Sequence, residues 1–429
     1  MSRLFAWFDT LVVRERVRNY SWIFVVMGSA ALVINAAFGQ LPLTLSGDMV
    51  TPDFLAHWTG GRLVLQGQAA ELYDPAAQSA VQMQSVGVTQ DLSWFISPPL
   101  TALLFVPFAA LPYSWGALAW TGVSLALLGW ALFLVRPFLG DRQGDHALFV
   151  LAIFATPAVL ELIGSGQVTA VALIAVTIAL RLLRVNHDVL AGAVLAVGLY
   201  KPHLFVLVPL ALLVQRKYRA LSSLAVTSAV LILLTLPAVG ARAWEAWLTT
   251  LTSPLYNDAV QAGLTWKMQS ISALATSLGA PPVAVYPLLL VGAAIFVWRT
   301  RAGRYPSSYV WTLALLTTVT FSPHVMVYDL VLLVPAMAYF HLRHNTAPTR
   351  LLAVVTCVLL WTIPLRYGLA THYPSWAPLK APWSALPLLC LSLILINKHD
   401  KNAQTVHRQR PSDGKHPHHG LLDDRPTAS

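Results

Sequence analysis

The sequence predicts an all-α protein that crosses a membrane about a dozen times. Hydrophobic residues make up 56% of the 429 residues and charged residues only 11%, whereas a typical soluble chain carries about 25% charged residues. Apolar stretches about as long as a bilayer crossing recur between Trp22 and Ile396. This composition excludes a soluble enzyme. The net charge of +10 does not indicate nucleic-acid binding, because the basic residues lie in short connections, where they set orientation.

The first apolar run, Trp22 to Phe38, follows several arginines and has no clear small-residue cleavage site. We therefore interpret it as an uncleaved first crossing. The basic clusters define a cytoplasmic face that includes both termini of a bacterial inner-membrane protein. These clusters are Arg14 to Arg18, Arg136 to Arg142, Arg181 to Arg184, Arg216 to Arg219, Arg299 to Arg304, Arg343 to Arg350, and the segment after Lys398.

Long loops then lie on the opposite, periplasmic face. In the first loop, apolar and polar residues are interspersed from Asp53 to Leu65. This pattern predicts a short helix at the outer interface, with Asp53 at its N-cap or in its first turn. The next segment, Pro98 to Val135, is too long for one straight crossing, so we expect a short helix over Leu100–Ala110 and then a full crossing. The long loops assigned to the periplasmic face are Leu45 to Ser97, Gly240 to Pro281, and Arg366 to Lys380.

Some hairpins are short and carry polar residues at their tips. Val189 to Val214 must cross and return, which leaves arms of about a dozen residues, or roughly 18 Å of helix, in a ~30 Å hydrocarbon core. Its tip is Tyr200-Lys201-Pro202-His203. Irregular backbone at membrane depth is tolerated where it lines a protein-enclosed or wet cavity, so we expect a cavity open to the outside. Two other hairpins, Asp145 to Arg184 and Tyr305 to Leu342, place tips at Gly164–Gln167 and Ser322–His324.

The polar residues of this face suggest two functions. A lysine inside the membrane, such as Lys201, is costly unless it is paired or hydrated, which indicates a functional role. A carboxylate, Asp53 or its competitor Asp48, next to cationic and histidine side chains suits transfer from a phosphate-linked donor. The same groups could serve a transporter or flippase for an anionic or lipid-linked solute, or the chain could be a structural subunit. Because the polar tips lie on one face only, the enzyme is favoured. We expect Asp329 to pair with a cation and Glu161 to be structural.

A series of short motifs resembles glycosyltransferase family 87. Each motif is weak alone, but their order and spacing between residues 20 and 395 are fairly specific. The motifs are Asp53-Phe54 through Trp58 to Gly67, Leu72-Tyr73-Asp74, Ser97-Pro98-Pro99-Leu100, Gly166-Gln167, Tyr200-Lys201-Pro202-His203, Met268-Gln269-Ser270, and Ser322-Pro323-His324 with Tyr328-Asp329.

The resemblance implies a GT-C type membrane enzyme with about 12 transmembrane helices and short interfacial helices in the first outer loop. Such a hexosyltransferase inverts the configuration at the anomeric carbon of the transferred sugar, which is expected to be mannose. It uses a polyprenyl-phosphate sugar donor, a lipid or glycan acceptor and the surrounding membrane lipids, and it needs no metal or cofactor. No motif identifies the sugar or the acceptor. Asp48 and Asp53 lie five residues apart, unlike a close acidic pair, which leaves the choice of base open.

The resemblance also implies roles for individual residues. The acidic position of the family falls on Asp53, the expected catalytic base. Its basic and histidine positions fall on Lys201, His203 and His324, which would hold the donor phosphate. The further residues predicted to contact substrate are Gln167, Arg62, Gln269, Tyr328 and Asp329.

The chain is predicted to contain one catalytic membrane domain, residues 1–397. The remaining segment, 398–429, is polar and lacks periodicity, which predicts a disordered cytoplasmic tail.

Overall fold

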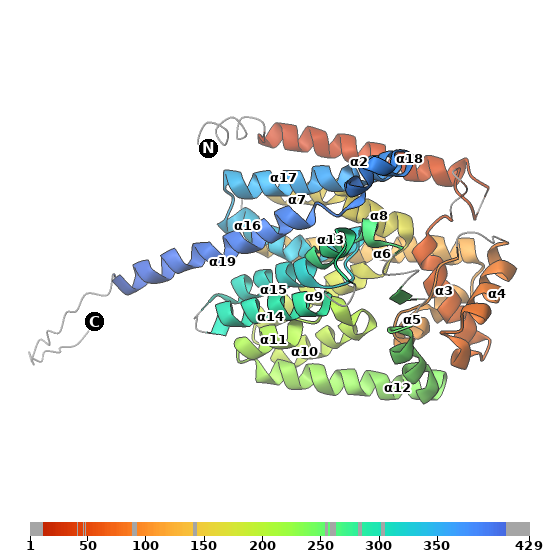
Figure 1. The fold of residues 1–429 in the computed structure, drawn as a ribbon. Helices are drawn as coiled ribbons and strands as arrows, with labels where there is room; N and C mark the ends of the chain where they lie inside the picture. The colour runs from red at the N-terminus through yellow and green to blue at the C-terminus, as the bar shows by residue number, and fades with distance from the viewer. Residues whose placement is uncertain are drawn as a thin grey trace, which may run out of the picture.

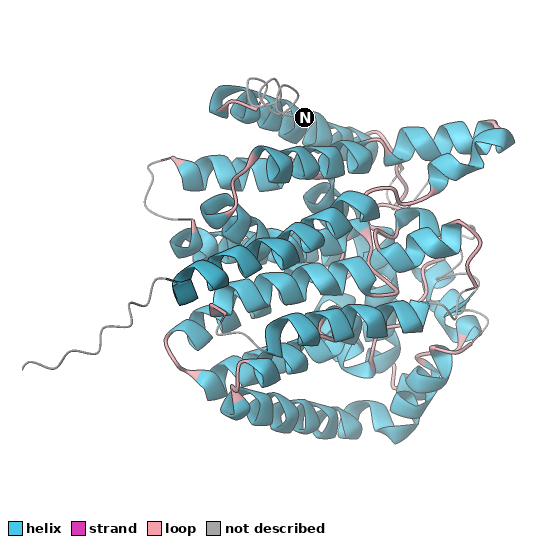
Figure 2. Cartoon of the chain, turned by 60° about the vertical axis from the view of Figure 1, so that its left-hand side comes forward, coloured by secondary structure: helices cyan, strands magenta, loops and turns pink. Residues whose placement is uncertain are grey.

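The computed structural model is all-helical over the residues it describes, and no strand occurs among them (Figure 1, Figure 2). The described residues are 12–40, 42–45, 47, 49–87, 92–139, 144–253, 256–257, 263–281, 285–301 and 305–408, with side chains described as far as 397. Most helices run along one common direction, and α3 (Pro52–Leu65), α4 (Pro75–Val86) and α5 (Pro99–Ala109) gather at one end (Figure 1).

Within the described residues, four helical segments are long and apolar enough to cross a membrane, or up to six if two bent pairs each count as one span. The predicted count of about twelve is not confirmed, because much of the bundle consists of shorter or broken helices. The long segments are α2 (Arg14–Ala37), α6 with η2 (Tyr113–Phe138), α12 (Tyr218–Thr250), and Pro374–Asn397. The bent pairs are α7 (Asp145–Phe154) with α8 (Pro157–Ser165) at 55°, and α17 (Ala347–Trp361) with α18 (Ile363–His372) at 48°.

The segment from Pro98 to Val135 forms the expected short helix followed by a long one. Helix α5 ends at Ala109, and α6 (Tyr113–Val135) begins after Pro112. Pro112 is the N-cap of α6 and has extended backbone angles, φ −53° and ψ 146°. Because proline at this position has no amide hydrogen to donate, it separates the two helices.

The predicted short hairpin with Lys201 at its tip is confirmed. Its arms are broken into short helices, and each arm is shorter than a full crossing. The other two predicted tips also fall between helices. The elements are α10 (Asp188–Leu195), η3 (Ala196–Tyr200), η4 (Pro202–Leu204) and α11 (Val208–Val214) for the first hairpin, α9 (Thr169–Arg184) after the Gln167 tip, and α15 (Ser307–Phe321), η8 (Val327–Leu333) and α16 (Val334–Arg343) around the His324 tip.

Helix α3 forms where the sequence predicted a short helix, and its place at the outer interface stays a prediction. Most of its residues from Phe54 to Leu63 are buried, because the helix packs closely against α5 and the segment before it. A Cβ at Gly61 would lie 2.8 Å from the Phe105 carbonyl carbon, and one at Gly60 would lie 2.7 Å from the Phe95 ring. The two glycines therefore allow α3 to insert into the protein.

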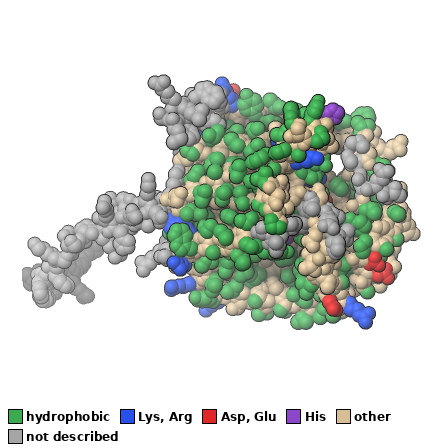
Figure 3. Space-filling model, viewed as in Figure 1, with side chains coloured by type: hydrophobic (Ala, Val, Ile, Leu, Met, Phe, Trp, Pro, Cys, Tyr) green, Lys and Arg blue, Asp and Glu red, His purple; other side chains and the backbone are tan. Residues whose placement is uncertain are grey.

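The remaining elements complete the bundle. Helix α19 (Ala385–Arg408) continues past the predicted boundary at Lys398, and residues 409–429 lie outside the described residues. Figure 3 shows a mostly hydrophobic surface between two ends: Lys and Arg side chains gather near the end where α19 projects, and Asp and Glu side chains gather mainly at the α3–α4 end. The elements not yet given are η1 (Ala69–Glu71), η6 (Thr265–Lys267), α13 (Ile271–Ser277), α14 (Val285–Arg301) and η9 (Pro374–Lys380).

Candidate functional site

The three predicted tips meet in one polar cluster. Lys201 Nζ lies 2.6 Å from the Asp329 carboxylate, and Gln167 Nε2 donates to the Tyr328 hydroxyl at 2.9 Å. A further contact between the Lys201 and His324 tips is made by Ser322 Oγ, which donates to the His203 carbonyl at 3.3 Å. Residues more than a hundred positions apart are thereby brought together.

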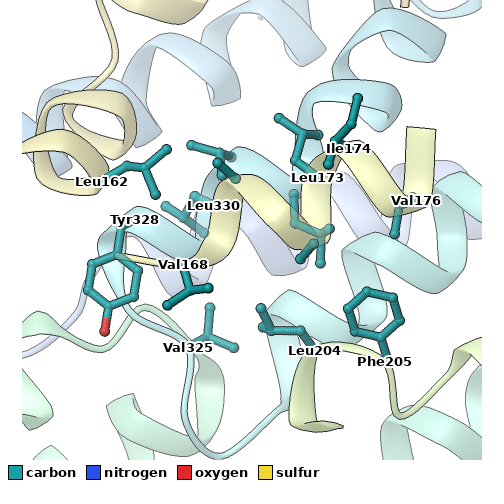
Figure 4. Packing of buried hydrophobic residues seen from close by; sticks show 14 of the residues in the cluster. Leu162, Val168, Leu173, Ile174, Val176, Leu204, Phe205, Val325, Tyr328 and Leu330 are labelled. Atoms are coloured by element: carbon teal, nitrogen blue, oxygen red, sulfur yellow. The ribbon is translucent and has the colours of Figure 1, made fainter. Parts of the chain in front are cut away.

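The apolar residue that follows each polar tip residue in the sequence packs in the core next to the cluster. Val168 follows Gln167, Leu204 follows His203, and Val325 follows His324, and all three are buried. Figure 4 shows Val168, Val325 and Leu204 packed beside Tyr328. The polar cluster therefore stands on a continuous apolar core.

The Gln167 tip is shaped by Gly166. This glycine has φ 72°, a left-handed conformation that glycine adopts without steric cost. A Cβ there would lie 2.6 Å from Phe54 Cβ, so the tip packs directly on the start of α3. Trp120 Nε1 donates to the Gly166 carbonyl at 2.9 Å. These contacts place the Gln167 side chain beside the helix that carries Asp53.

The Lys201 tip is anchored by Tyr200. The Tyr200 hydroxyl donates to the Val168 carbonyl at 3.1 Å and accepts from the Ala172 amide at 3.0 Å. Lys201 then reaches Thr169 Oγ1 at 3.2 Å and lies 4.7 Å from the centroid of the Tyr328 ring. Together with Asp329, Thr169 and the Tyr328 ring thus fix the position of the Lys201 ammonium group.

Asp329 is the counter-ion of Lys201, which confirms the expected pairing with a cation. Its side chain is fully buried. Oδ1 accepts from Lys201 Nζ and from Thr169 Oγ1 at 2.6 Å each, and Oδ2 accepts from the Met326 amide at 3.0 Å. A buried charge is tolerated when it is paired and hydrogen-bonded in this way. The contacts give Asp329 a positioning role, and its predicted contact with substrate stays a prediction.

The two predicted histidines lie next to each other. The ring centroids of His203 and His324 are 5.5 Å apart with nearly perpendicular planes. His203 Nε2 is buried and has no hydrogen-bond partner among the described residues. Tyr256 lies in the segment between α12 and α13, and the centroid of its ring is 6.4 Å from that of His324. The histidine pair therefore adjoins the lysine and carries a ring nitrogen available to a ligand.

Asp53 lies in the first turn of α3, as predicted, in a tightly built turn. Thr51 is the N-cap with φ 62° and ψ 60°, a rare conformation for a β-branched residue. Tyr113 holds this turn, since its hydroxyl donates to the Val50 carbonyl at 2.6 Å and lies 3.1 Å from Thr51 Oγ1. Strain of this kind occurs at functional sites and costs of order 1–3 kcal/mol.

The Asp53 carboxylate itself makes no hydrogen bond or ion pair within the described part of the chain, and it does not cap the amides of α3. It is half-buried and interacts electrostatically with Tyr328 and Glu161. The competing carboxylate, Asp48, lies outside the described residues. The choice between Asp53 and Asp48 as the base therefore stays a prediction.

Arg62 and Gln269 already have protein partners. Arg62 donates to the Ala109 carbonyl at 3.2 Å, and it lies nine positions after Asp53, roughly 13.5 Å along the helix axis. Gln269 is fully buried, contacts Ser384 Oγ through its amide oxygen, and donates to the Lys267 carbonyl at 3.0 Å. These contacts hold α3 and the second outer loop in place, and the predicted roles in orienting substrate are untested.

Sequence reasoning gave no role to His57 or Lys267, and it expected Glu161 to be structural. His57 lies four positions after Asp53 and interacts with Lys201 and Gln167. Glu161 interacts electrostatically with Asp53 and with Lys267. The four-residue spacing was a signal for His57, because residues i and i+4 share a helix face. No local pattern connects Glu161 in α8 with Lys267 in the second outer loop.

No group of three or more His, Cys, Asp or Glu side chains that could hold a metal ion occurs among the residues with described placement. Lys201 contributes a positive charge to the cluster. Lys201 Nζ has three donor hydrogens, and Asp329 and Thr169 accept two of them. A donor therefore remains for a ligand.

A buried lysine, a histidine pair and an open carboxylate within an apolar helical bundle define a membrane protein that handles a polar ligand. The profile of glycosyltransferase family 87 matches residues 95–325, just over half of the chain. The chain therefore belongs to glycosyltransferase family 87, and membership implies a membrane glycosyltransferase. No curated protein and no solved structure matches the chain significantly. The matched segment includes Gln167, Lys201, His203, Gln269 and His324.

Proposed function

We propose that the chain transfers a hexose from a polyprenyl-phosphate donor to a hydroxyl of a lipid or glycan on the periplasmic side of the bacterial inner membrane. Mannose is the expected sugar. The observation that carries this proposal is a carboxylate and an ammonium group in one cluster. No described residue donates a hydrogen bond to the Asp53 carboxylate, and the Lys201 ammonium is fixed beside two histidines.

The proposed step is a single displacement. Asp53 takes the proton of the acceptor hydroxyl as its oxygen attacks the anomeric carbon. The bond from that carbon to the phosphate oxygen breaks, and polyprenyl phosphate leaves with the electron pair. Lys201, His203 and His324 stabilise the charge that develops on this phosphate. Attack opposite to the leaving group inverts the anomeric configuration, and no metal takes part.

The buried pair of Lys201 and Asp329 supports this arrangement. A lysine held by a carboxylate and a hydroxyl does not need to reorganise when phosphate charge develops. The unpartnered Nε2 of His203 provides a second group that is already in place. Tyr328 contacts Lys201 and interacts electrostatically with Asp53, and Gln167 is hydrogen-bonded to it, so a sugar bound between the phosphate-binding residues and Asp53 would meet these two side chains.

Purified protein in detergent, supplied with a radiolabelled polyprenyl-phosphate hexose and a set of lipid and glycan acceptors, tests the reaction. We expect labelled product and free polyprenyl phosphate in equal amounts, and an inverted anomeric linkage by NMR. If no hexose is transferred but labelled solute crosses reconstituted vesicles, the proposal is wrong and the chain is a transporter.

Reporter fusions test the orientation. Fusions at Asp74 and Tyr373 are expected on the periplasmic side, and fusions at Lys217 and Arg301 in the cytoplasm, because Lys and Arg mark the cytoplasmic side. A cytoplasmic signal at Asp74 would place the Asp53 site on the wrong side of the membrane.

A further inference from the structure

His57 combines three properties that a merely structural histidine would not need. It lies on α3 one turn after Asp53, so both side chains leave the same face of the helix. It is only 6% exposed. Its Nδ1 atom is buried and has no hydrogen-bond partner among the described residues. A buried polar atom that is left unsatisfied is costly, which indicates a missing partner.

The imidazole ring is held in one orientation by aromatic neighbours. It stacks on Phe105 with ring centroids 4.8 Å apart and an interplanar angle of 24°, and it meets the edge of Phe95 at 6.2 Å. Gln167 and Lys201 from two tips of the polar cluster also act on the ring. The two ring contacts come from separate segments, so the imidazole ring has a defined orientation.

The charge state follows from the surroundings. The pKa of His57 is lowered to about 3, mainly by burial and secondly by the positive charge of Lys201. An interaction with the Gln167 side chain opposes this shift. The ring is then neutral, and a neutral imidazole has one protonated nitrogen and one nitrogen that accepts a hydrogen bond.

We propose that His57 is a substrate-binding residue whose Nδ1 atom accepts a hydrogen bond from a substrate hydroxyl. A phosphate at neutral pH offers only acceptor oxygens, so it would repel the lone pair of an accepting Nδ1, whereas a sugar or acceptor hydroxyl can donate to it. His57 would thus separate the hydroxyl-binding side of the cluster from the phosphate-binding side at Lys201, His203 and His324. The inference deepens the proposed glycosyl transfer and rests on it.

Three substitutions separate the two ring nitrogens. His57→Asn keeps an amide near the position of Nδ1, His57→Gln keeps one near Nε2, and His57→Phe keeps the stacking on Phe105 without any hydrogen bond. Melting temperature and gel filtration identify variants that fail to fold. His146→Gln is the matched control, since His146 Nε2 already has a partner, the Leu132 carbonyl at 3.1 Å.

We expect His57→Gln and His57→Phe to lower kcat/KM by roughly 10- to 100-fold, because a hydrogen bond to substrate is lost, and His57→Asn to lose less. A donor or acceptor that lacks the bound hydroxyl should be equally poor with wild type and with His57→Phe. Folded His57→Gln and His57→Phe with wild-type kcat/KM would overturn the inference, and so would an equal penalty on every deoxy analogue.

A spectroscopic measurement separates this inference from the proposed reaction. In ¹⁵N-histidine NMR, with His57 assigned by its absence from His57→Phe, Nδ1 should be unprotonated and should shift when methyl mannoside or a polyprenyl-phosphate hexose is added. If wild type transfers no hexose, the reaction fails, yet a shift of Nδ1 still supports the hydroxyl site. A protonated Nδ1, or one that does not respond to either compound, overturns the inference.

Discussion

Asp53 and Asp329 are both carboxylates of the same polar cluster, yet the protein treats them in opposite ways. Asp329 is fully buried and accepts hydrogen bonds from Lys201, Thr169 and the Met326 amide. Asp53 is half-buried, and no described residue donates to it. The Asp329 carboxylate therefore stabilises the structure of the site, whereas the Asp53 carboxylate is left available for a ligand.

The difference identifies which acid can act as a base. The Asp329 oxygens are buried and already accept three hydrogen bonds, so they are not free to receive the proton of an acceptor hydroxyl. A general base must instead reach the acceptor hydroxyl at about 2.6–3.2 Å. Asp53, which starts a helix on a strained turn and caps none of its amides, has the required freedom. Mutations of the two residues should thus affect different properties.

The largest effect is expected for Asp53→Asn. Asn keeps the size of the side chain and removes its basicity, and general-base catalysis is typically worth 10²–10⁴-fold. Turnover should fall by roughly that factor, measured with the purified protein, while the melting temperature and donor binding stay near wild type.

The controls are the neighbouring acids. Asp48→Asn and Glu161→Gln should each lower turnover much less than Asp53→Asn. A dead Asp48→Asn beside an active Asp53→Asn would make Asp48 the base. If all three variants were active, the contrast between Asp53 and Asp329 would have no catalytic meaning.

Asp329→Asn should act mainly on stability. The change leaves the Lys201 ammonium, whose side chain is only 12% exposed, without its counter-charge, and breaking a buried ion pair costs about 3–5 kcal/mol of unfolding free energy. We expect a clearly lower melting temperature in detergent than for Asp53→Asn. Equal melting temperatures for the two variants would show that both acids are equally dispensable to the fold.

A double replacement sharpens this prediction. Lys201→Met with Asp329→Leu removes both charges, which is often neutral for stability, so the double variant should melt above Asp329→Asn. Its affinity for polyprenyl phosphate should nevertheless fall together with turnover, because the ammonium is absent in both ground and transition states. Recovery of donor binding in the double variant would exclude Lys201 from the phosphate site.

The sequence was sufficient to predict which residues gather at the tips. The hairpin around Lys201, the tip at Gln167 and the tip at His324 all occur where expected, because short apolar arms between basic clusters leave few alternatives. The class of fold followed from composition alone. The number of crossings did not, because broken pairs such as α7–α8 and short helices such as α5 divide the apolar stretches.

Contacts between distant segments were beyond sequence reasoning. Nothing in the motif around Asp53 shows that the helix is buried on α5, since that depends on Gly60 and Gly61 meeting Phe95 and Phe105. The local pattern also could not show that Arg62 and Gln269 already have protein partners. Their partners are carbonyl and hydroxyl groups that become neighbours only in the folded chain.

The smallest effect is expected from chelators. Mg²⁺ and Mn²⁺ bind carboxylate oxygens together with substrate phosphates. The oxygens of Asp329 already accept hydrogen bonds, so of the two residues only Asp53 could bind such an ion. Its electrostatic neighbour Glu161 lies near Lys267, a cation that competes with a metal for the same negative charge. Turnover should therefore be unchanged after incubation with EDTA and unchanged again on adding Mn²⁺. Loss of activity in EDTA that Mn²⁺ restores would make Asp53 a metal ligand, and Glu161→Gln should then weaken the Mn²⁺ dependence, because the Glu161 carboxylate interacts electrostatically with Asp53.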